Sequence, residues 1–144
     1  MLSNTSKYAI RATIYLALHT SGDSKIGIKE ISKKLNIPSP FLGKILQSLA
    51  KQKLLSSTKG PNGGFGLARK ADEITLYDII QIIDGDDLFT KCLISMRSCA
   101  EENIPCPLHS KYEKIRDDIS QMFRNQTIAE LAKEIENSGS EIMI

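Results

Sequence analysis

Three cysteines and a histidine, side chains that bind soft metal ions, recur at regular intervals in this sequence. Cys92, Cys99 and Cys106 have six residues between each, and His109 follows after two more. The odd number of cysteines argues against a disulfide framework, and no pair has the Cys-X-X-Cys spacing that is typical of zinc sites. All four lie in one segment of eighteen residues without a regular period, and such a loop can wrap thiolates around a metal cluster. The residues alone leave three interpretations open: a cluster, a zinc ion, or ordinary thiols beside a surface histidine.

Charge divides the chain into a basic half and an acidic half. The net charge of the 144 residues is +2. Residues 1–70 contain twelve Lys or Arg and two acidic residues, a net charge of +10, whereas residues 71–144 contain seven basic and fifteen acidic residues, a net charge of −8. This separation favours a polyanion as the partner of the first half. A solvated basic surface is the alternative.

Composition excludes several classes of protein. The 41% apolar and 25% charged residues are typical of a globular chain, and no stretch approaches the roughly 20 apolar residues of a membrane helix. The apolar run over residues 8–18 contains Arg11 and lacks a signal-peptide cleavage site, so we expect a cytoplasmic chain without membrane association. No catalytic Ser/His/acid set, carboxylate pair or nucleotide-binding loop is present, which predicts that the chain is no enzyme and takes no small-molecule substrate.

Three amphipathic helices are predicted in the first third of the chain. The first runs from about residue 3 or 6 to residue 20, and the second covers residues 28–35 with Asn36 as its stop. Ser39 is the expected cap of the third helix, with Pro40 at its first position. The open face of this third helix is expected to carry Gly43, Lys44, Gln47 and Lys51. Two short helices joined by a turn are typical of a helix-turn-helix.

A β-hairpin is predicted directly after the third helix. Residues 54–58 favour a strand, residues 59–66 form a Gly-rich turn, and residues 67–69 return as the second strand. A hairpin after a helix-turn-helix makes a winged helix, with the wing tip placed for a minor groove. The side chains expected to contact DNA are Lys29, Lys33, Lys34, Ser39, Lys44, Gln47, Lys51, Lys59 and Asn62.

Two further helices are predicted from capping boxes. Thr75 and Asp78 begin a helix that Gly85 ends, and Thr127 begins a last helix over residues 128–135. We expect the chain to divide into a winged-helix DNA-binding domain (1–85), a cysteine-containing cluster loop (86–107), and a part with the dimerisation helix and the C-terminal helix (108–144).

A regular apolar stripe marks the helix that precedes the last one. Its residues alternate spacings of four and three: Leu108, Tyr112, Ile115, Ile119 and Met122. These are the core positions of a seam between two helices. We expect a homodimer seam, because winged-helix proteins usually bind paired half-sites; packing on the first helix of the same chain is the alternative.

Five segments make the chain resemble the Rrf-type winged-helix regulators, the family that contains IscR, NsrR and CymR. The segments are KYAIR (7–11), EIS (30–32), FLGKIL (41–46), KGPNGGF (59–65) and ITL (74–76). The resemblance covers nearly the whole chain, and the wing and the cysteine loop are its specific parts. It implies a mainly α fold with a small β-hairpin wing and a long dimerisation helix, a homodimer, and a repressor or activator bound to a palindromic operator in double-stranded DNA.

The resemblance also implies a set of cluster ligands. IscR-like members have three cysteines and a histidine in this region, so Cys92, Cys99, Cys106 and His109 correspond to ligands of an iron–sulfur cluster. NsrR-like members use an aspartate of the first helix as the fourth ligand, and the matching residue here is Lys7, which cannot ligate. This favours a 2Fe–2S cluster, with 4Fe–4S as the second choice and zinc or redox-active free thiols as the alternative to any cluster.

Two positions depart from the pattern of the IscR-like members. Gly43 stands where they carry an acidic residue that reads a base, and Lys59 stands in place of the common wing arginine. Arginine reads guanine or a narrow minor groove with a planar fork that lysine lacks. We therefore expect DNA binding to be kept and the operator sequence to differ.

Overall fold

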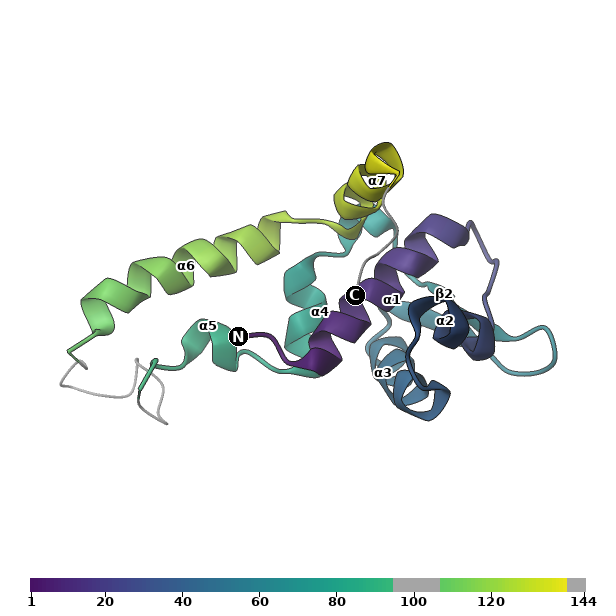
Figure 1. Ribbon diagram of the computed structural model, residues 1–144, viewed down its shortest axis with the longest axis horizontal. Helices are drawn as coiled ribbons and strands as arrows, with labels where there is room; N and C mark the ends of the chain where they lie inside the picture. Colours follow the sequence, from purple (N-terminus) through teal and green to yellow (C-terminus); the bar gives the residue numbers. More distant parts are fainter. Residues whose placement is uncertain (95–106, 140–144) are drawn as a thin grey trace.

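The computed structural model describes residues 1–94 and 107–139, which are mainly helical with one antiparallel hairpin (Figure 1). The elements in chain order are α1 (Asn4–His19), α2 (Ile28–Leu35), α3 (Ser39–Lys51), β1 (Leu55–Thr58), β2 (Gly64–Leu67), η1 (Ala71–Glu73), α4 (Leu76–Ile83), α5 (Asp87–Thr90), α6 (His109–Asn125) and α7 (Ile128–Ser138). Residues 1–85 and α7 form a head, and α6 extends from it as an arm. The expected fold class, a winged helix with a long additional helix, is confirmed.

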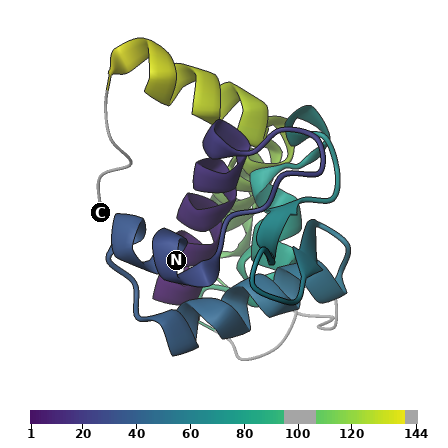
Figure 2. The same ribbon diagram turned by 90° about the vertical axis from the view of Figure 1, so that its right-hand side faces the viewer.

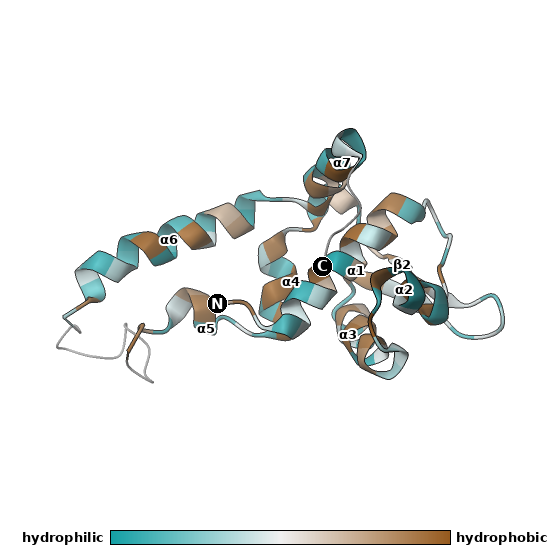
Figure 3. Cartoon of the chain, viewed as in Figure 1, coloured by the Kyte–Doolittle hydropathy of each residue, from teal (hydrophilic) through white to brown (hydrophobic). Residues whose placement is uncertain are grey.

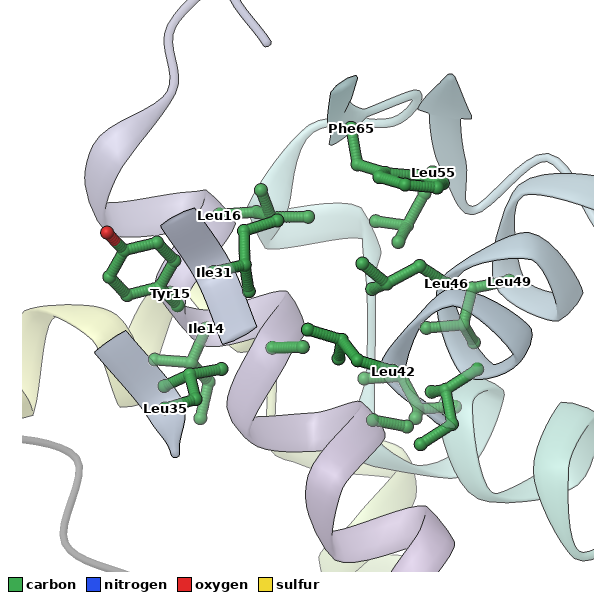
Figure 4. Packing of buried hydrophobic residues seen from close by; sticks show 14 of the residues in the cluster. Ile14, Tyr15, Leu16, Ile31, Leu35, Leu42, Leu46, Leu49, Leu55 and Phe65 are labelled. Carbon is green, nitrogen blue, oxygen red and sulfur yellow. The ribbon is translucent and has the colours of Figure 1, made fainter. Parts of the chain in front are cut away.

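The head is built around α1. This helix packs against α2, α3, α4, β2 and α7, and its Ala9, Ala12 and Leu16 are completely buried. Ser3, the earlier of the two starts that the sequence left open, caps the helix, because its hydroxyl accepts the Ser6 N–H at 3.0 Å. Figure 4 shows Leu16 in one cluster with side chains from α2, α3 and the hairpin.

The returning strand of the wing begins earlier than the sequence predicts. The hairpin pairs Leu55 with Leu67 and Thr58 with Gly64, so residues 64–66 belong to the strand and not to the turn. The reason is tertiary: Phe65 is buried and exchanges two backbone hydrogen bonds of 2.9 Å with Ile26. The chain segment before α2 therefore adds a third short partner to the base of the wing.

The beginning of α3 also differs from the prediction. Pro38 occupies the cap, and its carbonyl accepts the N–H groups of Phe41 and Leu42 at 3.1 and 2.9 Å. Ser39 is the first helical residue, and no side chain caps this helix. The short elements η1 and α5 were not expected from the sequence.

The two predicted capping boxes lie side by side. Thr75 and Thr127 each accept the backbone N–H of the third residue of their helix, and both form the reciprocal bond. A bridge joins these two threonines, with Leu76 N–H bonded to the Gln126 carbonyl at 3.0 Å. The helix that follows, α7, turns back onto α1 (Figure 2). Its Ile128 belongs to the core cluster of the head, so the predicted third part of the chain shares a core with the first.

We expect Gly64→Ala to destabilise the protein because a Cβ there would lie 2.2 Å from the Ile26 carbonyl oxygen. Relieving this overlap requires the base of the wing to separate from residue 26, at a cost of about 2–4 kcal/mol of unfolding free energy. Urea denaturation followed by circular dichroism measures the change. The matched control is Gly27→Ser, where a Cβ would lie 4.0 Å from the Gly63 carbonyl oxygen. An unfolding free energy for Gly64→Ala within 0.5 kcal/mol of the wild type would contradict the packing described here.

Candidate nucleic-acid interface and metal-binding segment

Helix α3 buries one face and exposes the other, as predicted. Leu42, Leu46 and Leu49 are completely buried and Ile45 nearly so, and Figure 4 shows Leu42 and Leu46 in one cluster with Ile31 of α2. The opposite face is exposed at Lys44, Gln47 and Lys51. A helix held in this way presents polar side chains on a rigid support.

Gly43 does not lie on the open face, so that part of the prediction is wrong. The residue is buried, and a Cβ at this position would lie 3.0 Å from Cδ1 of Ile28. The side chain of Ile28 on α2 covers the site that was expected to face a ligand. An acidic side chain at position 43 would need Ile28 to move.

The turn between α2 and α3 is fixed by local bonds. Asn36 adopts the left-handed conformation with φ of 54°, which asparagine tolerates better than most residues. The Ser32 hydroxyl donates to the Ile37 carbonyl, and the Ile37 N–H donates to the Ser32 carbonyl at 3.1 Å. These bonds set the angle at which α3 leaves α2.

Two side chains of α1 support the helix-turn-helix from behind. Arg11 Nη2 donates to the Leu35 carbonyl at the end of α2 at 3.1 Å, and its guanidinium carbon lies 5.8 Å from the centre of the Tyr8 ring. Burial lowers the pKa of Arg11. The Tyr8 ring meets Phe41 edge-on, with centroids 5.7 Å apart. The sequence placed Tyr8 and Arg11 in a family motif but assigned them no role, because both contacts are tertiary.

The residues expected to contact DNA are accessible, and the lysines among them form no ion pair with the acidic side chains of the described residues. Ser39 is half-buried; the exposed members are Lys29, Lys33, Lys34, Lys44, Gln47, Lys51, Lys59 and Asn62. The close acid–base pairs of the described chain are Lys91–Asp87 (2.6 Å), His109–Glu113 (3.6 Å) and Arg116–Asp117 (3.7 Å). None of them involves these lysines, so within residues 1–94 and 107–139 no carboxylate pairs with the basic face.

Helix α6 carries an apolar stripe that the rest of the described subunit covers only in part. None of its residues is buried, and Ile115 and Met122 are 56% and 54% exposed. Leu108, Tyr112 and Ile119 are half-buried. Among the described elements, α6 packs chiefly on α4 and α5. Figure 3 shows hydrophobic bands alternating with hydrophilic ones along this arm.

An aromatic cluster attaches the arm to the head. The Phe89 ring of α5 lies 4.8 Å from Tyr77 of α4 and 6.1 Å from Phe123 of α6, centre to centre. Arg124 stacks over Tyr77, with its guanidinium carbon 3.5 Å from the ring centre. This cluster fixes α5, and therefore the chain that leads to Cys92, against α6.

Only two of the four expected metal ligands can be located. Cys99 and Cys106 lie outside the described residues. Cys92 is half-buried just after α5, and His109 is the first residue of α6, with Nε2 3.6 Å from Glu113 Oε2. The described residues hold no group of three or more His, Cys, Asp or Glu side chains that could bind a metal ion, so a metal site that includes Cys92 or His109 needs ligands from outside the described residues.

Cys92 opens onto a cleft of about 460 Å³ between the head and the arm. Tyr112 lines the same cleft and follows His109 by three residues, so Cys92 lies near the first turns of α6. Asp84 also lines it and accepts the Ser3 N–H at 3.1 Å. Burial raises the pKa of Asp84, but the hydrogen bonds from Ser3 and Ser6 and the positive charge of the N-terminus together outweigh burial and hold the pKa below its ordinary value. The donor set at this end of the arm is compatible with a thiolate and imidazole metal site.

Comparison with known proteins gives consistent results. The model of the Rrf2 family, described as "Iron-dependent Transcriptional regulator", matches residues 2–134. A protein of Aquifex aeolicus (strain VF5) is 38% identical over 91% of this chain and 90% of its own length. The HTH-type transcriptional regulator IscR of Sodalis glossinidius (strain morsitans) is 30% identical over 90% of this chain and 77% of its own length.

Solved structures share the fold. T. potens IscR superposes with a TM-score of 0.78 at 24% identity, covering 99% of this chain and 93% of its own. CymR (YrzC), the global cysteine regulator of B. subtilis, superposes with a TM-score of 0.76 at 23% identity, covering 93% and 97%. The matched family and the Aquifex and Sodalis proteins are described as transcriptional regulators, which confirms the expectation that the chain is no enzyme. No helix of the described residues is long and apolar enough to cross a membrane. Since the family match extends over residues 2–134, the chain belongs to the Rrf2 family of winged-helix transcriptional regulators.

Proposed function

We propose that this chain is a cytoplasmic homodimeric transcriptional regulator that binds a palindromic operator and whose activity is set by an iron–sulfur cluster. The observation that carries the proposal is α3, whose apolar face is buried while Lys44 and Gln47 stand on the opposite face, where no carboxylate of the described residues pairs with the lysine. A cationic, exposed recognition helix is what a major groove requires.

The residues proposed to contact DNA form two groups, those that reach bases and those that reach phosphates. Lys44 and Gln47 contact base edges from α3, with Ser39 at its start, and Lys59 and Asn62 enter the minor groove from the wing. The lysines at the periphery neutralise phosphates: Lys29, Lys33, Lys34 and Lys51. Phosphate contacts position a protein on the duplex, whereas base contacts determine sequence.

We expect operator affinity to fall steeply with salt, by about 0.9 in log K per decade of salt for each neutralised phosphate. Gln47→Ala should change the preferred sequence with an unchanged salt slope, because its amide reaches a base edge and carries no charge. Lys51→Ala is the matched control, which should weaken binding to all sequences and reduce the slope by about one. Fluorescence anisotropy with selected and scrambled duplexes measures both. Affinity that hardly changes between low and moderate salt would contradict the assignment.

The cluster part of the proposal rests on the family description and on the chemistry of four residues. Cys92, Cys99, Cys106 and His109 would hold a 2Fe–2S cluster, with 4Fe–4S as the second choice. When bound, a cluster supplies reversible electron transfer and sensitivity to oxidants. Lys7, at the position of the NsrR-type aspartate, is exposed on α1 and offers no carboxylate. Glu113 Oε2 lies 3.6 Å from His109 Nε2, one turn along α6, which is longer than a hydrogen bond.

We expect anaerobically purified protein to be brown and His109→Ala to lose or shift the visible absorption. His19→Ala is the control: His19 lies against the Tyr15 ring at 4.4 Å, far along the chain from the cysteine segment, and should leave the spectrum unchanged. His109→Cys should keep a cluster but lower its potential, because a thiolate adds negative charge. An unchanged spectrum and potential in His109→Ala would place the fourth ligand elsewhere.

A thiol-based regulator is the second candidate. The observation that favours it is the likeness to Staphylococcus aureus CymR, solved in an oxidized form, with a TM-score of 0.73 and 26% identity. Colourless protein whose operator affinity changes on reversible thiol oxidation would support this candidate against the cluster. Colourless protein with bound zinc would support a zinc site.

The stripe on α6 is the proposed dimer seam. Its residues are Leu108, Tyr112, Ile115, Ile119 and Met122, and the exposure of Ile115 and Met122 leaves an apolar strip that a second α6 could cover. The arm extends away from the head in the subunit, so two arms can pair while two heads reach neighbouring half-sites.

We expect Ile115→Asp to run as a monomer and to lose operator binding. Because Ile115 is 56% exposed in the subunit, the substitution should leave the fold of the monomer intact. It would place a charge in the seam, which should weaken association by about 3 kcal/mol or more. Lys114→Ala, one residue earlier on the exposed surface, is the control and should remain dimeric. Light scattering after size-exclusion chromatography measures the mass. A dimeric Ile115→Asp protein would show that the seam lies elsewhere.

A further inference from the structure

Phe41 is an exposed aromatic residue on an otherwise polar face. Its exposed fraction is 39%, and between residues 2 and 92 no other large hydrophobic side chain is exposed. Burial of apolar surface would favour covering this ring. It is the third residue of α3, whose other face supplies core residues of the head.

The ring lies at the end of α3 that a helix-turn-helix directs toward bases. Phe41 precedes Lys44 by three residues, so the two side chains share one side of the helix. Its neighbour Leu42 points into the core instead and is completely buried. Residues at the beginning of a recognition helix are the ones that contact base edges in the major groove.

The ring is also held before any ligand arrives. Tyr8 meets it edge-on, at 5.7 Å between centroids and 88° between planes, and Tyr8 lies beside the guanidinium of Arg11. A ring fixed in this way loses little conformational entropy on binding. The contact leaves about two-fifths of the residue exposed, so packing against α1 does not account for all of its surface.

We propose that Phe41 reads the 5-methyl group of a thymine in each operator half-site. The proposal rests on the proposed function, because it requires α3 to enter the major groove. The edges of the bases there carry hydrogen-bond donors and acceptors and only one apolar group, the thymine methyl. An aromatic ring without a polar atom can discriminate between bases in this groove only through that methyl, so Phe41 adds a specificity residue to Lys44 and Gln47.

The test removes the methyl and the ring separately. An operator is selected from random duplexes with wild-type protein, and each thymine of a half-site is then replaced in turn by deoxyuridine. At one position the replacement should weaken wild-type binding about fourfold, the effect of one buried methyl group. Replacing it in both half-sites should weaken binding about sixteenfold, since the two effects add in free energy. Phe41→Ala should bind the thymine and deoxyuridine duplexes equally, with an unchanged salt slope.

Lys51→Ala is the matched control and should keep the fourfold difference while binding more weakly overall. The proposal is overturned if wild-type protein tolerates deoxyuridine at every position, a result that needs no variant and so does not depend on the folding of Phe41→Ala. It is also overturned if Phe41→Ala still binds the thymine duplex more tightly than the deoxyuridine duplex, which would show that the ring only packs against Tyr8 of α1 and contacts no base. In both cases sequence-specific binding by the wild type leaves the proposed function standing, whereas failure to select any operator overturns both.

Discussion

The burial of α1 is the constraint on which the rest of the structure depends. The helix contacts α2, α3, α4, β2 and α7, and a helix surrounded in this way needs small side chains where its neighbours approach. Ala9 and Ala12 provide them, while Leu16 fills the space beside them, and all three are completely buried. A fully buried leucine contributes about 1.5–3 kcal/mol, and the alanines allow helix axes to approach within about 8–10 Å. Five elements of the head (α2, α3, α4, β2 and α7) are therefore positioned against one helix.

The same helix links packing to DNA recognition. On the side that faces α2 and α3, Arg11 bonds to the end of α2 and Tyr8 contacts the beginning of α3. The recognition helix is thus oriented by a support that does not itself need to touch DNA. The arm is attached differently, through the rings of Tyr77, Phe89 and Phe123. Head and arm therefore meet at α4 and α5, close to the chain segment that leads to Cys92.

Features encoded by neighbouring residues could be predicted from the sequence. The capping boxes at Thr75 and Thr127 and the left-handed Asn36 need only a few consecutive residues, and the buried stripe of α3 follows from helical periodicity. Features that depend on a distant partner could not be predicted. The start of β2 is set by Ile26, the burial of Gly43 by Ile28, and the role of Arg11 by the end of α2. For the proposed metal site, the four residues come from the resemblance to IscR-like members, and the structure locates two of them, Cys92 and His109.

The packing of α7 on α1 has a consequence for how the protein is made. The two helices are about 110 residues apart in the chain, and at roughly 5–20 residues per second the ribosome needs about 5–20 s to synthesise the stretch between them. During that interval the surface of α1 that α7 later covers has no partner within the nascent chain, although the helix-turn-helix and the wing have already been synthesised. The core of the DNA-binding head is therefore completed by one of the last of its elements to be synthesised. A truncated chain without α7 would contain the whole recognition helix, but its core would be incompletely covered. Such a chain would expose apolar core surface and would therefore be prone to aggregation.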